Sequence, residues 1–183
     1  APWRHQVSER KTIEQLWADF RRENKLPNGY ATARFWSVAL WHFNIFLPNF
    51  RWRQRAIIAH DMHHLITGYP CTMRGECLIA AWEYGAGPCR HPAAVMFCLP
   101  LIFIGFLFSP KESWLAFRRG REMTSLHRHP IHLSQMQASL EEIAQDLESQ
   151  RPVRKAHFGV FLAILCLSAA TIMAPFPLLL VAF

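Results

Sequence analysis

The distribution of charge along the chain constrains the fold more than any other feature of the sequence. Every Lys, Arg, Asp and Glu lies at or before Lys155, so the C-terminal part of the 183-residue chain is uncharged. The run Phe158–Phe183 is long enough to cross a bilayer, but Pro175 and Pro177 limit an unbroken helix to its first 17 residues. We therefore expect a tail that spans or inserts deeply into a membrane, or that packs as a C-terminal helix.

This asymmetry divides the chain into two expected parts. Residues 1–156 form a helical metal- and lipid-binding domain, and residues 157–183 form an apolar tail that is a candidate membrane anchor. Apolar side chains recur with helical spacing, and Ser109–Glu112 has the pattern of a capping box, so we predict a compact, multi-helix, all-α fold. The expected helices are Thr12–Asn24, Ala31–Leu47, Arg51–Thr67, Thr72–Tyr84, Ser109–Leu126 and Ser134–Glu148. The uncharged run Pro92–Ser109 is interrupted by Pro100, so we expect it to pack in the core or insert at a membrane interface rather than to span.

The basic balance of the chain is best explained by an anionic membrane surface. The formal net charge is +7, but no recognisable nucleic-acid-binding module accompanies it, so we expect no nucleic-acid partner. A solvated basic face is the alternative. The basic side chains expected to bind headgroups are Arg51, Arg53, Arg55, Arg118, Arg119, Arg121, Arg151, Arg154 and Lys155. If the tail spans, the last three lie on the cytoplasmic side.

The cysteines argue against a zinc–thiolate site. There are five of them, an odd number, and no two have the CxxC spacing. We expect reduced thiols in a reducing compartment, several of them packed as small apolar groups.

The segment His60–His64 carries the strongest chemical signal. His60 and His64 are four residues apart on a predicted helix, so both imidazoles project from one face, as they do in helical zinc sites. Asp61 is three residues before His64 and can join that face. His63 points to the other side of His60, so we expect it to support the ligands or to lie at the surface rather than to bind metal.

A second carboxylate follows after a tight turn. Gly68 and Pro70 end the helix that carries the histidines, and Glu76 lies about one turn into the next helix. Such a corner can bring Glu76 over the two imidazoles, which gives a set of two histidines and two carboxylates suited to a divalent transition metal. The alternative is that these histidines are ordinary core or surface residues, although burying four ionisable groups without a partner is costly.

The order His60-Asp61-x-x-His64, Gly68-x-Pro70 and Gly75-Glu76 resembles the HDxxH-x11-E signature of the Coq-four family of ubiquinone (coenzyme Q) biosynthesis. The similarity extends more weakly over about Arg51 to Leu147. It includes the aromatic-acidic stretch Ala81-Trp82-Glu83, the basic segment Phe117–Arg121 and the acidic segment Ser139–Leu147. Residues 1–50 and the apolar tail have no counterpart in this resemblance.

The resemblance implies an all-helical, membrane-associated protein that binds a polyprenyl lipid. It implies an enzyme, a lyase that removes the ring carboxylate of a polyprenyl hydroxybenzoate intermediate, coupled to hydroxylation at that carbon. The implied metal ligands are His60, Asp61, His64 and Glu76, with zinc the leading choice of metal and iron, cobalt or manganese as alternatives. The implied partners are a polyprenyl quinone precursor and other quinone biosynthesis proteins. The implied location is the cytoplasmic face of a bacterial inner membrane or the mitochondrial inner membrane.

The sequence also allows two other functions, and it allows two roles for the large apolar residues. The protein could be a lipid-binding scaffold that presents polyprenyl intermediates to partner enzymes and holds a structural metal. It could also be a metal-dependent hydrolase, although Asp61 is shorter than the glutamate of H-E-x-x-H enzymes and so is a poorer base. Large apolar groups could line a groove for the prenyl chain or could simply pack in the core: Phe35, Trp36, Trp41, Phe43, Phe46 and the run Val95–Phe108.

Overall fold

The computed structural model describes residues 11–26, 29, 31–40, 43–130, 138–149 and 157–173. Within these ranges the chain forms seven helices and one two-stranded sheet, so the predicted all-α class is confirmed apart from a single hairpin. The elements are α1 (Ile13–Glu23), β1 (Phe35–Leu40), β2 (Phe43–Pro48), α2 (Arg51–Thr67), α3 (Met73–Ala86), α4 (Pro92–Phe108), α5 (Pro110–Gly120), α6 (Leu140–Ser149) and α7 (Phe158–Met173).

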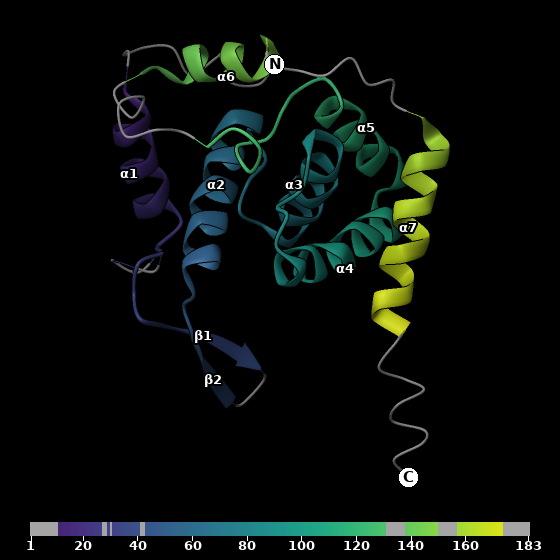
Figure 1. Cartoon of the computed structure of the whole chain (residues 1–183), viewed down its shortest axis with the longest axis horizontal. Helices are drawn as coiled ribbons and strands as arrows, with labels where there is room; N and C mark the ends of the chain where they lie inside the picture. The colour runs from purple at the N-terminus through teal and green to yellow at the C-terminus, as the bar shows by residue number, and fades with distance from the viewer. Residues whose placement is uncertain are drawn as a thin grey trace.

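Helix α3 lies at the centre of the fold. It packs most closely on α5, and α4 packs against both of these helices. Trp82 of α3 and Phe117 of α5 are almost fully buried in the core. Figure 1 shows α1 and α2 on one side of this centre, α7 on the other side, and α6 lying across one end. The most buried helix therefore has α2, with its histidines, as a neighbour.

The predicted helix Ala31–Leu47 is wrong, because this region forms an antiparallel hairpin. Phe35 of β1 pairs with Pro48 of β2, and Leu40 pairs with Phe43. Asn49 closes the base of the hairpin: its side-chain amide donates to the carbonyls of Ala31 and Ala33 at 3.1 and 2.9 Å. Aromatic and β-branched residues favour strands, and these contacts join the two ends of the hairpin. Trp41 lies outside the described residues.

Several helix boundaries also differ from expectation. Helix α5 begins with Pro110 as predicted, but it ends at Gly120 rather than near Leu126. Ser109 gives the helix no side-chain capping bond, so the predicted capping box is wrong. Complete capping boxes lie instead at α1, where Thr12 and Gln15 bond to each other's backbone N–H groups, and at α6, where Ser139 and Glu142 do the same. Helix α6 begins at Leu140, and the earlier part of the helix predicted from Ser134 lies outside the described residues except for its last two positions.

The uncharged segment after residue 157 forms a helix that packs on the body of the protein. Phe161 and Leu165 of α7 are buried, and α7 lies along α4. The Ser168 hydroxyl donates to the Leu99 carbonyl and accepts from the Phe103 N–H at 3.2 Å, so it bridges two backbone groups of α4. None of the helices in the described parts of the chain has the length and apolar character needed to cross a membrane. Pro175 and Pro177 lie outside the described residues.

Candidate metal centre

The corner between α2 and α3 brings three of the four predicted ligands together. Gly68 ends α2 in a left-handed conformation, with φ of 74°, and its N–H donates to the His64 carbonyl at 2.8 Å. Thr72 caps α3 by accepting from the Gly75 N–H. A Cβ atom on Gly75 would lie 1.8 Å from the carbonyl oxygen of Pro70, so only glycine permits this close approach. The tight corner places Glu76, the next residue, beside the α2 histidines.

Three side chains direct their ligand atoms to one point. His60 Nε2 lies 3.0 Å from Glu76 Oε2, and His64 Nε2 lies 3.3 Å from Glu76 Oε1. The two Nε2 atoms are themselves 3.3 Å apart. His64 Nδ1 lies 2.8 Å from the Tyr69 carbonyl, which can only accept, so Nδ1 carries the proton and Nε2 of the neutral ring has a lone pair. These three residues could hold a metal ion.

The charges of this cluster are strongly coupled. Burial lowers the pKa of His60, but Glu83 and Glu76 outweigh it and raise that pKa to about 10. Burial raises the pKa of Glu76, but its close contacts with His60 and His64 outweigh burial and lower that pKa to about 2. In the absence of a metal, His60 therefore keeps a proton, and this proton lies between ring nitrogens and carboxylate oxygens that would otherwise all be hydrogen-bond acceptors facing one another. A divalent cation can replace this proton, since a neutral imidazole and a carboxylate are ordinary ligands of transition metals.

Asp61, the fourth predicted ligand, borders the cluster but is not among the groups whose ligand atoms converge. It is buried, and its Oδ2 has no hydrogen-bond partner among the described residues. Burial, with a smaller effect of Glu76, raises the pKa of Asp61 to about 7, against the opposing effects of Trp17, His64 and Arg21. The structure therefore brings three of the four predicted residues together and leaves Asp61 beside them.

Glu83 and His127 were not predicted as part of the site. Glu83 is buried, and its Oε1 lies 3.1 Å from His60 Nδ1, 2.7 Å from His63 Nδ1 and 3.2 Å from His127 Nε2. Glu83 follows Glu76 by two helical turns, a spacing that could have indicated a shared face. Nothing local in the sequence indicates His127, because it reaches the site from the loop after α5.

The cluster is partly accessible to solvent through His60 and Glu76. The His64 side chain is 1% exposed and stacks on Phe20 of α1, with ring centroids 5.8 Å apart. The side chains of His60 and Glu76 are 24% and 31% exposed. Two imidazoles and one carboxylate leave further coordination positions for water or substrate, which is the arrangement found in catalytic rather than closed structural metal sites.

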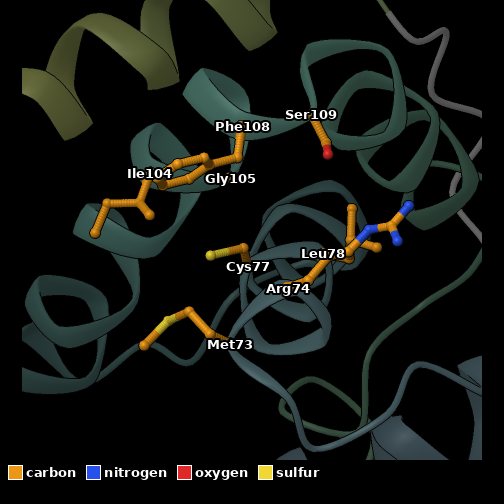
Figure 2. Close-up of a pocket in the computed structure, with 8 residues that line it drawn as sticks. All are labelled: Met73, Arg74, Cys77, Leu78, Ile104, Gly105, Phe108 and Ser109. Carbon is orange, nitrogen blue, oxygen red and sulfur yellow. The ribbon is translucent and has the colours of Figure 1, made fainter.

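Two cavities flank the helices that carry the cluster. One, of about 460 Å³, lies beside α2 and reaches the loop after α5, where His127 is part of its wall. The other, of about 220 Å³, lies between α3 and α4 and is shown in Figure 2. Its apolar lining includes Met73, Cys77 and Phe108. Only the larger cavity includes a residue, His127, that is hydrogen-bonded to the Glu83 network.

Comparison with known proteins does not place the chain in a family. No family model, no curated protein and no solved structure matches it.

Proposed function

We propose that this protein is a metal-dependent lyase that removes the ring carboxylate of a polyprenyl hydroxybenzoate during ubiquinone biosynthesis. The convergence of His60, His64 and Glu76 on one point carries this proposal. Their order along the chain is that of the HDxxH-x11-E signature, and the corner at Gly75 explains why that spacing is needed. In the reaction, the bond between the ring carbon and the carboxylate breaks, CO2 leaves, and the ring carbon takes a proton.

Zinc is the leading choice for the metal, with iron, cobalt or manganese as alternatives. Two imidazoles and a carboxylate suit all four ions, and zinc is bound by such sets in many hydrolytic and lyase sites. When bound, the ion supplies a Lewis acid that polarises an oxygen of the substrate. Asp61 lies next to the cluster, its Oδ2 has no hydrogen-bond partner in the described part of the chain, and in its ionised form it adds to the attraction for a cation.

The cavity beside α2 is the proposed binding place for the prenylated ring. Its size of about 460 Å³ is within the range of small-molecule sites. Trp52, Met62 and Leu126 give it apolar walls for isoprene carbons, whereas the exposed Arg55 offers a positive charge to the ring carboxylate. His127 connects this wall to the metal cluster through Glu83, so substrate and metal would be held on the same scaffold.

The proposed membrane association rests on α4 and α7. Both helices lack charged residues, and both expose large apolar side chains. The exposed apolar residues of the two helices are Met96, Phe97, Leu107, Phe108, Phe158, Val160, Leu162, Leu167 and Met173. Apolar surface on this scale suits contact with lipid, where polyprenyl precursors reside. We place the protein at the cytoplasmic face of a bacterial inner membrane or at the mitochondrial inner membrane, beside other quinone biosynthesis proteins.

Most of the basic side chains expected to bind headgroups fall into three groups in this proposal. Arg51 and Arg118 are exposed and suit anionic headgroups, whereas the exposed Arg55 lines the cavity and is assigned to the ring carboxylate. Arg53 lies 3.9 Å above the Trp36 ring, and Arg119 donates to the Thr67 carbonyl, so both have partners within the protein. The predicted headgroup contacts of Arg151, Arg154 and Lys155 fall outside the described residues.

Metal content and turnover of the purified protein test the proposal. We expect about one metal ion per chain by elemental analysis, and release of CO2 from a prenylated hydroxybenzoate. His64→Ala should lose both, because it removes a buried ligand, whereas His157→Ala should keep both, because His157 is exposed and outside the cluster. Metal retained by His64→Ala would refute the site assignment. Metal without turnover in the unaltered protein would favour the lipid-binding scaffold.

A cellular experiment tests the pathway. A strain that lacks this protein should accumulate a carboxylated quinone precursor. Glu76→Ala should fail to restore quinone synthesis, whereas Glu112→Ala should restore it, because Glu112 lies on the surface in an ion pair with Arg74. A strain that accumulates no such precursor would contradict the proposed reaction.

A further inference from the structure

The Glu83 carboxylate lies where three histidines from separate parts of the chain meet. His60 and His63 come from α2, whereas His127 comes from the loop that follows α5. The Glu83 side chain is 3% exposed, and all three contacts are made to the same oxygen, Oε1. A buried carboxylate needs such donors, and each of these rings must present an N–H to it because an ionised carboxylate can only accept.

The protonation of His63 follows from its second contact. The Leu126 backbone N–H donates to His63 Nε2 at 2.9 Å, so this nitrogen carries a lone pair. The proton of the neutral ring is then on Nδ1, from which it is donated to Glu83 at 2.7 Å. Both nitrogens of His63 are thus occupied by hydrogen bonds. Although His63, Glu83 and His127 lie close enough to hold a metal ion, a metal at His63 would have to displace one of these bonds.

His60 is in a different position, because only its Nδ1 faces Glu83. Its Nε2 is directed toward Glu76 and His64. We infer that Glu83 is a positioning residue: by accepting the Nδ1 proton of His60, it keeps the Nε2 lone pair directed at the metal position. His63 and His127 hold the Glu83 carboxylate in place for this role. Histidine ligands of metals commonly donate their second N–H to a carboxylate in this way.

This arrangement links the cavity wall to the metal cluster by two hydrogen bonds. His127 lines the cavity beside α2 and contacts Glu83, which contacts the ligand His60. The inference rests on the proposed function only in that the cluster binds a divalent metal. It makes no use of the identity of the substrate.

Nitrogen-15 NMR of the zinc-loaded protein tests the inference directly. With labelled histidine, the His60 ring should show a protonated Nδ1 and a zinc-bound Nε2. A His60 ring with zinc on Nδ1 would overturn the inference, and this measurement needs no variant at Glu83. Resonances are assigned by comparison with His60→Gln and His157→Ala.

Zinc affinity supplies the second measurement. Glu83→Gln keeps the size of the side chain but removes the charge, and we expect zinc binding by chelator competition to weaken about 10- to 100-fold. Glu112→Gln, which alters a surface ion pair, should leave the affinity unchanged. If Glu83→Gln does not fold, Glu83→Asp keeps the charge but withdraws it from His60, and the same loss is expected. Unchanged affinity in a folded Glu83 variant would contradict the positioning role.

The NMR and zinc-affinity results can be distinguished from a failure of the proposed function. Both measurements use zinc alone, without substrate. An unaltered protein that binds zinc with the expected His60 tautomer but releases no CO2 would refute the decarboxylase proposal and leave the role of Glu83 intact.

Discussion

The affinity of the cluster for metal should depend on pH because a metal ion must displace a proton from His60. The pKa of this imidazole is raised to about 10, so between pH 7.5 and 9.0 the metal-free site holds one proton that the metal-bound site does not. Each pH unit then strengthens metal binding about tenfold. Over this interval the gain is about 30-fold, or about 2 kcal/mol.

The sign of this dependence follows from proton release. Raising the pH favours the state with fewer protons, which is the metal-bound state, so affinity rises with pH and levels off above the His60 pKa. Asp61, with a pKa raised to about 7, is largely ionised above pH 7.5 and steepens the dependence only at lower pH. Glu76 is ionised throughout, because its pKa is about 2.

Competition with a chelator whose own protonation is corrected for measures this effect. Calorimetry in buffers of different ionisation enthalpy should independently give about one proton released per zinc ion at pH 8. A metal affinity that does not change between pH 7.5 and 9.0, with no proton released, would refute the picture of a proton held between His60 and Glu76. His157→Ala serves as the control and should show the same slope as the unaltered protein.

Three further outcomes are expected. Phe161→Ala should lower the free energy of unfolding, measured by denaturant titration, by about 3–5 kcal/mol, because the ring is fully buried. Leu162→Ala should change it little, because the Leu162 side chain is half-exposed. Gly75→Ala should abolish zinc binding by forcing the corner apart, whereas Gly159→Ala, with no atom near the added methyl, should keep it. Ala56→Trp should fill the cavity beside α2, so that CO2 release stops while the zinc content is kept.

The convergence of His60, His64 and Glu76 could be predicted because its determinants are local. The spacing of His60 and His64 defines one helical face, and Gly68 marks where the chain turns. Only a short turn separates the end of α2 at Thr67 from the start of α3 at Met73, so Glu76 in the first turn of α3 stays close to the α2 histidines. Asp61 was assigned to the same face from its spacing alone, but its side chain borders the cluster instead of entering it, and helical spacing does not determine the rotamer.

The hairpin and the Glu83 network could not be predicted with the same arguments. The segment from Phe35 to Pro48 is rich in aromatic residues, which suit a buried helix or a strand, and the deciding contact comes from the buried Asn49 side chain. His127 approaches Glu83 only because α5 packs on α3 and the following loop turns back. Such a contact depends on the assembled core, so no local pattern indicates it.

The bridge made by Ser168 has a consequence for how α7 finds its place. Two uncharged helices with continuous apolar faces could dock in several registers, one turn apart, with similar burial. The hydroxyl group has backbone partners only where it reaches the Leu99 carbonyl and the Phe103 N–H of α4. A slipped register would leave this buried hydroxyl unpaired. One polar atom therefore selects a single alignment of α7 on α4 that apolar packing alone would not distinguish from its neighbours.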